Sequence, residues 1–334
     1  MRTALIVAAL ALTGVIAADV TDAIGSSNKA QRRGALRDMD DCGAITMQLA
    51  YDDGALFRMD ADGTHRRRVT RQAAFHPAWS PDGAWIAFDR EASGTGAPGD
   101  IYLVGADGER PRRLTRSRDS FLPAWSPSGR QIYFEGLNTG GFFRINADGS
   151  SRRRLPRSSF PDAWSPDGRQ FATATKTGIV VVNADGSGRR QITRGDATNV
   201  TWSPEGEQIA FVTGRGFTGI ALVNADGSGR RQLTHGQDTQ LAWSSDGTRI
   251  AFLGSRGNLV VVNVATGALH QLTRLREPNL TYNPEWSPDG NWIAFAHWAA
   301  LPLWGNHVYV IKSDGTRLHD LGTGVDPTWR PCPG

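Results

Sequence analysis

The chain has 334 residues, and its 37 lysines and arginines nearly match 33 acidic residues, for a formal net charge of +4 at pH 7. Because the charges are so evenly balanced, we expect no nucleic-acid partner. Only two cysteines are present, which excludes a cysteine-rich metal centre and allows at most one disulfide within the chain.

The N-terminus carries a short apolar segment. Arg2 precedes an apolar run from Ala4 to Ala17, which ends in small residues and is too short to span a bilayer comfortably. This predicts a cleaved signal peptide over residues 1–18 and a secreted or periplasmic protein; the alternative is an uncleaved anchor. Residues 19–41 are polar and charged, which predicts a flexible tail before one folded domain, residues 42–334, without a membrane span.

A five-residue motif, W-S-P-D-G, recurs through this domain in complete, varied or truncated form. Successive copies start 38 to 46 residues apart. Self-similarity with this period is typical of β-propellers, in which each repeat forms a blade of four short strands. The copies start at Trp79, Trp125, Trp164, Trp202, Trp243, Trp286 and Trp329.

One repeat shows how the motif divides a blade. Residues 200–202 precede a turn at 204–206, and three short β-branched or aromatic segments follow at 208–212, 220–224 and 231–234. Proline presets φ for such turns and glycine accepts a positive φ. The segments are too short for helices, so each repeat predicts four antiparallel strands, named a to d from the ring centre outward.

This repeat resembles that of the TolB-like β-propellers, which are related to the WD-repeat propellers. The resemblance covers residues 44–331. It implies an all-β propeller, but the fold alone does not imply one function, because propellers host many.

The two ends of the domain are expected to share a blade. Residues 44–70 supply strands b, c and d, and residues 325–329 supply the missing strand a. We therefore predict a seven-bladed propeller of four-stranded antiparallel blades, closed by the C-terminal strand joining the N-terminal blade. Cys42 and Cys332 fall on either side of the a–b turn of that blade, which predicts a disulfide in an oxidising compartment; the alternative is two free thiols.

Alternating strand directions place the a–b and c–d turns on one face and the b–c and d–a loops on the other. Two b–c loops, at 91–99 and 297–307, are much longer than the rest and frame one arc of this second face. Exposed aromatic residues anchor interfaces; the alternative is that the tryptophans of the second loop pack against the blade. Partner contacts are predicted at Tyr51, His297, Trp298, Trp304 and His307.

The same face carries a basic residue after most copies of strand d. Such a ring attracts an acidic polypeptide or an anionic envelope polymer; the alternative is a solvated feature of the repeat. The ring consists of Arg71, Arg116, Arg157, Arg194, His235 and Arg274, reinforced by Arg118 and Arg276.

No hydrolase, nucleotide-binding or metal-protease motif is present. We therefore predict a monomeric, non-enzymatic interaction scaffold with no catalytic residue, metal site or cofactor. The alternative is a hydrolase or lyase with a polar or Ca²⁺ site at the channel mouth, acting on an anionic glycan or small substrate. Its residues lie three positions before the strand-a tryptophans: His76, Asn199, Gln240, Asn283 and Asp326.

Overall fold

The computed structural model describes residues 45–48, 54–91, 99–155, 161–214, 218–274, 281–299 and 305–331. Within these ranges the only helical element is a 3₁₀ turn, Ser255–Gly257. No helix in the described parts is long and apolar enough to cross a membrane. The predicted signal peptide, the tail, Cys42 and Cys332 lie outside the described residues.

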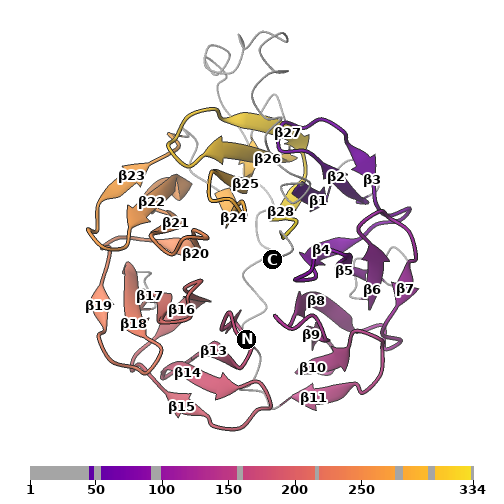
Figure 1. Cartoon of the computed structure of the whole chain (residues 1–334), viewed down its shortest axis with the longest axis horizontal. Helices are drawn as coiled ribbons and strands as arrows, with labels where there is room; N and C mark the ends of the chain where they lie inside the picture. The colour runs from indigo at the N-terminus through magenta and orange to yellow at the C-terminus, as the bar shows by residue number, and fades with distance from the viewer. Residues whose placement is uncertain are drawn as a thin grey trace, which may run out of the picture. The chain divides into compact units, whose positions relative to one another are not determined.

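The strands form seven four-stranded antiparallel sheets arranged in a ring (Figure 1). Six sheets, blades 1 to 6, each consist of four consecutive strands. The remaining sheet, the closing blade, joins β28 to β1, β2 and β3, with Ile45 paired to Trp329. The all-β propeller with four-stranded antiparallel blades is thereby confirmed.

Blades 1 to 3 occupy the first half of the ring. Strand d has only two or three residues in each of them, because a D-G turn precedes it; in blades 1 and 3 a buried threonine follows shortly after it. Their strands are β4 (Phe75–Trp79), β5 (Trp85–Arg90), β6 (Asp100–Gly105), β7 (Arg112–Arg113), β8 (Ser120–Trp125), β9 (Gln131–Gly136), β10 (Gly141–Asn146), β11 (Arg153–Leu155), β12 (Ala163–Trp164), β13 (Gln170–Thr175), β14 (Gly178–Asn183) and β15 (Arg190–Gln191).

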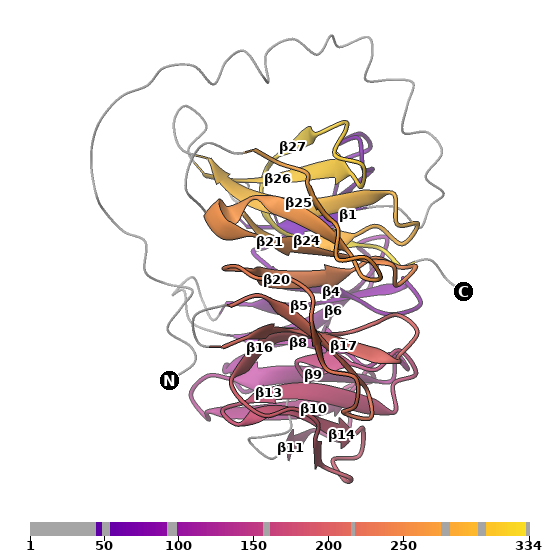
Figure 2. The same ribbon diagram turned by 90° about the vertical axis from the view of Figure 1, so that its left-hand side faces the viewer.

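Blades 4 to 6 and the closing blade complete the ring. The innermost strands contact one another from blade to blade, and the side view shows several of them stacked in succession (Figure 2). These strands are β16 (Ala197–Trp202), β17 (Gln208–Thr213), β18 (Ile220–Asn224), β19 (Arg231–Gln232), β20 (Thr239–Trp243), β21 (Arg249–Leu253), β22 (Leu259–Asn263), β23 (Leu269–Gln271), β24 (Thr281–Trp286), β25 (Trp292–Ala299), β26 (Gly305–Lys312), β27 (His319–Thr323), β28 (Val325–Trp329), β1 (Ile45–Gln48), β2 (Leu56–Met59) and β3 (Arg67–Arg68).

The serine of the W-S-P-D-G motif explains why the motif turns the chain between strands a and b. In blade 1, Ser80 Oγ donates to Asp82 and accepts the N–H of Trp85 at 2.9 Å. Gly83 completes the turn with a φ of 64°. The side chain thus satisfies backbone groups that the turn removes from the sheet.

The hydrophobic core lies between blades. Ile220 and Leu222 of blade 4 pack in one cluster with Trp243 and Phe252 of blade 5. Three of the motif tryptophans, Trp125, Trp286 and Trp329, also link blades by hydrogen bonds: Trp286 Nε1 donates to the carbonyl of Ala242 in the preceding blade at 3.0 Å. The large ring therefore fills the space between neighbouring sheets, and the sheets support one another around the ring.

Candidate functional site

Strand a carries an irregularity in six of the seven described blades. In all blades except blade 3, the register of strands a and b shifts just before the tryptophan. The third residue before the tryptophan there has a left-handed φ of 49° to 53°, which costs a non-glycine residue about 1–2 kcal/mol. Strain of this kind is common at functional sites. The residues are His76, Leu122, Asn199, Gln240, Asn283 and Asp326.

The five predicted channel-mouth residues therefore share both a position in the repeat and a backbone conformation. Blade 3 differs because Pro161 stands there, and the proline ring does not permit a positive φ. A bulge bends the strand and redirects the side chain. The W-S-P-D-G spacing therefore predicted the members of this set, but not the strained backbone that unites them.

Four of these residues form an arc across five consecutive blades. Hydrogen bonds connect its members on either side, and the charge of Asp326 acts on His76 between them. Asn283 donates its backbone N–H to Gln240 Oε1 and its Nδ2 to Asp326 Oδ1, the latter at 2.8 Å. The arc continues through His76, whose Nδ1 lies 2.8 Å from Asp89 Oδ1. Asp89 also accepts the N–H of Leu122 at 3.1 Å. Asn199 lies outside these contacts.

Burial and the neighbouring charges shift the pKa of the titratable groups in this arc. Burial, the largest influence on His76, lowers its pKa, but the hydrogen bond and charge of Asp89 and the charge of Asp326 outweigh burial and raise it. Burial raises the pKa of Asp326, while the charge of His76 and the hydrogen bond from Asn283 partly oppose the shift. The arc thus holds a cation-forming imidazole between two carboxyl groups.

Two acidic residues of this region were not predicted. Asp89 is buried and receives two hydrogen bonds in the arc. Glu285 retains some accessible surface, but desolvation of its carboxyl raises the pKa to about 7, against the opposing hydrogen bonds from Trp329 N–H and Thr328 Oγ1. Glu285 was detectable, because the equivalent positions of the other blades carry only alanine or threonine.

The cationic ring is positioned by a threonine at the end of strand d. In five blades this buried threonine accepts, through Oγ1, the N–H of the first or second residue of strand c, as Thr193 does for Ile179 at 2.9 Å. The hydrogen bond fixes the chain as it leaves the sheet, and the basic residue that follows is exposed. These exposed residues are Arg71, Arg116, Arg194, His235 and Arg274.

None of these five ring residues forms an ion pair with any part of the chain that the structure describes. The loops that carry them lead directly into strand a, so the ring and the channel-mouth arc lie on the same face. Arg157 and Arg276 are outside the described residues. The described part of the ring is therefore four exposed arginines and one exposed histidine on the b–c/d–a face.

Two of the residues predicted to contact a partner at the second long loop are buried. His297 and His307 lie opposite each other on β25 and β26, only 7% and 5% exposed. His307 Nδ1 contacts both carboxyl oxygens of Asp320, at 3.0 and 2.9 Å. The prediction that these two histidines contact a partner at the surface is wrong, because the blade covers them. Tyr51, Trp304 and the side chain of Trp298 lie outside the described residues.

The described residues can also be compared with the alternative prediction of a Ca²⁺ site at the channel mouth. Across the described ranges, no group of three or more His, Cys, Asp and Glu side chains is arranged to hold a metal ion. Asp326 and Asp89 instead contact Asn283, His76 and a backbone N–H. The described channel mouth thus offers hydrogen-bonding and proton-transfer groups.

The ring of four-stranded sheets with bulged inner strands defines the class of protein as a β-propeller. A family model described as the TolB beta propeller domain matches residues 154–332, more than half of the chain. The chain therefore belongs to the TolB β-propeller family.

Several solved structures share the fold. TolB from Acinetobacter baumannii is 21% identical with a TM-score of 0.56, over 86% of this chain and 67% of that one. An oligogalacturonate lyase in complex with manganese is 15% identical with a TM-score of 0.60, over 83% of both chains. The oligogalacturonate lyase from Vibrio parahaemolyticus is 13% identical with a TM-score of 0.60, over 84% of this chain and 86% of that one. At these identities the similarity shows the fold alone.

Proposed function

We propose that this chain is an exported, non-enzymatic interaction propeller that binds an acidic protein segment or an anionic envelope polymer on its b–c/d–a face. The observation that carries the proposal is the cationic ring. Arg71, Arg116, Arg194 and Arg274 are exposed at equivalent positions of four blades and lack carboxylate partners among the described residues. Cations presented in this way attract a multivalent anion at long range and pair with it at contact.

The repeat explains why such a surface is stable without a partner. Each cation follows a threonine whose hydroxyl is bonded to the backbone, so its position does not depend on a side-chain contact. The guanidinium groups stay in water, where mutual repulsion is screened by salt. A partner with regularly spaced carboxylates gains several charge-assisted hydrogen bonds at once.

Defined anionic polymers test this proposal. Poly-glutamate and polygalacturonate are titrated against the wild type, an Arg71→Glu/Arg116→Glu/Arg194→Glu variant and an Arg130→Glu/Arg169→Glu/Arg189→Glu variant. The second set changes the same charge on the opposite face. We expect salt-sensitive binding that the first set of substitutions reduces at least tenfold and the second set leaves within threefold. Equal losses in both variants contradict a face-specific site.

A second candidate is favoured by the channel-mouth arc: an acid–base enzyme, such as a lyase acting on an anionic glycan. His76 contacts buried Asp89 on a strained segment of backbone, and oligogalacturonate lyases are among the proteins with a similar fold. In such an enzyme His76 or Asp326 is the group that moves a proton while the cationic ring holds the glycan.

The same polymer experiment separates the two candidates. Binding of polygalacturonate without release of an unsaturated product supports the interaction scaffold. Product release that disappears in His76→Gln, while binding is retained, supports the enzyme. The assay is repeated with added Mn²⁺ or Ca²⁺, since one of the similar lyases is in complex with manganese.

A further inference from the structure

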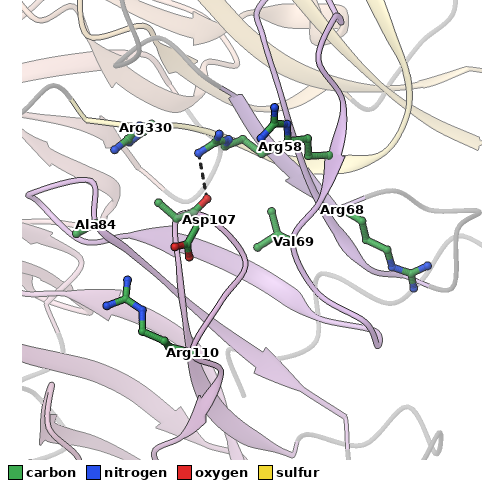
Figure 3. A pocket seen from close by; sticks show the side chains of 9 residues that line it. Arg58, Arg68, Val69, Ala84, Asp107, Arg110 and Arg330 are labelled. Atoms are coloured by element: carbon green, nitrogen blue, oxygen red, sulfur yellow. Dashed lines mark hydrogen bonds between the residues drawn. The ribbon is translucent and has the colours of Figure 1, made fainter.

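A groove on the opposite face lies between the closing blade and blade 1. It has a volume of about 360 Å³, and five of its nine lining residues are arginines. Figure 3 shows three of these, Arg58, Arg110 and Arg330, placed around Asp107. The lining carries five arginines and one aspartate, namely Arg58, Arg67, Arg68, Arg110, Arg330 and Asp107.

Other junctions show why the repeat keeps an arginine at the start of strand d. Arg112 Nη2 donates to the carbonyl of Ala147 in the next blade at 2.6 Å. Arg231 Nη2 donates to the carbonyl of Val264 in the same way, at 2.6 Å. At these junctions the arginine connects two blades through a turn carbonyl, so its role is structural.

The junction at the groove departs from this rule. Arg67 is the equivalent strand-d arginine, but the turn carbonyl, that of Ala106, accepts a hydrogen bond from Arg58 Nη1 at 3.0 Å. Most other blades have a buried apolar residue at the position of Arg58, such as Leu103 or Leu222. The Arg67 side chain is exposed and makes no hydrogen bond or ion pair with any described residue. Its structural role is therefore filled by Arg58.

Arg330 and Arg110 are also departures from the repeat. Arg330 stands where the six complete blades have the turn serine; its Nε donates to the carbonyl of Gly83 at 3.0 Å. Arg110 lies with its guanidinium carbon 4.8 Å from the centre of the Trp85 ring. Neither contact neutralises a charge. Both restrain a guanidinium at the border of the groove, which lowers the entropy lost when an anion binds.

The lining thus carries five arginines and a single aspartate around one small cavity, and the Arg67 side chain among them has no partner in the described residues. Arginine forks pair with phosphate and carboxylate groups through two parallel hydrogen bonds. The volume is at the lower end of the range for small-molecule sites. We propose that this groove binds a compact polyanion, a small molecule with two or more phosphate or carboxylate groups.

Blade 2 supplies a matched control for this site. Arg153 pairs with Arg144 in the same register in which Arg67 pairs with Arg58. The next junction, however, has Ser126 and Gly188 at the positions of Arg330 and Arg110. Replacing Arg153 by glutamine therefore removes the same charge from the same strand position without affecting the groove.

The test uses isothermal titration of the full chain with inorganic pyrophosphate and, separately, citrate, at low and high salt. We expect one equivalent of at least one probe to bind, a loss of tenfold or more in Arg67→Gln/Arg110→Gln, and less than twofold change in Arg153→Gln. A preference for pyrophosphate identifies a phosphorylated ligand, and a preference for citrate identifies a polycarboxylate. Thermal unfolding of each variant verifies that the fold is retained.

Failure to bind either probe at low salt overturns the proposal, as does an equal loss in Arg153→Gln and Arg67→Gln/Arg110→Gln. Binding of poly-glutamate at this groove without binding of either small probe also overturns it, because the occupant is then a polypeptide. The groove variant leaves the cationic ring unchanged, so the result is independent of the function proposed for the opposite face.

Discussion

Asn283 Nδ2 donates to Asp326 Oδ1 at 2.8 Å, and this contact links blade 6 to the closing blade at the channel mouth. Both residues have a left-handed φ, 53° and 50°, at the same position of the repeat. The charge of Asp326 in turn helps to raise the pKa of His76 in blade 1. The channel mouth is thus one electrostatic unit made from adjacent repeats.

The pKa of His76 is expected to exceed its ordinary value of 6.5. The cause is the hydrogen bond and charge of Asp89 together with the charge of Asp326, which outweigh the lowering by burial. A raised folded pKa stabilises the fold below the unfolded value, and this gain is lost as pH rises through the folded pKa. Titration of the imidazole by NMR measures the pKa directly, and Asp89→Asn must lower it. A His76 pKa below 6.5 in the wild type refutes this prediction.

Glu285→Gln is expected to stabilise the protein above pH 7 and to have little effect below pH 4.5. The pKa of Glu285 rises from 4.5 to about 7, so wild-type stability falls as pH increases through this window, because the unfolded chain ionises first. The shift corresponds to about 3 kcal/mol at most. Urea unfolding at pH 4.5 and pH 8 measures the difference. A stability difference that does not change between these pH values contradicts the raised pKa.

Thr193→Val is expected to destabilise the protein by about 1–3 kcal/mol, because it leaves the buried N–H of Ile179 without its acceptor. The bond from this N–H to Thr193 Oγ1 is 2.9 Å long. Thr193→Ser keeps the hydroxyl and is expected to cost less. Chemical denaturation of both variants makes the comparison, and a loss that is larger in Thr193→Ser than in Thr193→Val would show that the methyl group, not the hydroxyl, stabilises this position.

Arg190→Gln is expected to destabilise the protein more than Arg67→Gln does, although the two substitutions change equivalent residues of the repeat. Arg190 donates to the carbonyls of Asp226 and Ala225 in the next blade, at 2.6 and 3.0 Å. Removing these bonds is expected to cost about 1–2 kcal/mol, whereas Arg67→Gln changes the free energy of unfolding by less than about 0.5 kcal/mol. Thermal unfolding in parallel measures both. If Arg67→Gln lowers the free energy of unfolding as much as Arg190→Gln does, Arg67 has a structural role, and this contradicts its assignment to ligand binding.

The sequence predicted the elements whose chemistry is local. Serine, proline, aspartate and glycine form the a–b turn by themselves, so the motif around Trp79 or Trp286 was sufficient to locate strands a and b. The spacing of the motif also predicted that His76, Gln240, Asn283 and Asp326 occupy the same position in their repeats. Because the repeats are alike, this local pattern indicated which residues from distant parts of the chain gather at the channel mouth.

Features that depend on packing between blades were not predictable in the same way. The alternation of strand b did not show that Asp89 meets His76, since the contact depends on the bulge in strand a. His297 and His307 resembled surface residues because they flank a long loop, but β25 and β26 extend far enough to bury them. Glu285 differed from its equivalents, and that difference in the repeat was an available signal.

The most direct test of the proposed function is affinity capture from the envelope fraction of the source organism at low and high salt. The baits are the wild type, Arg71→Glu/Arg116→Glu/Arg194→Glu and the opposite-face variant Arg130→Glu/Arg169→Glu/Arg189→Glu. We expect an acidic partner that the wild type and the opposite-face variant retain at low salt, and that the ring variant loses. A partner captured equally by all three baits, or one insensitive to salt, would contradict the assignment of the cationic ring as the binding surface.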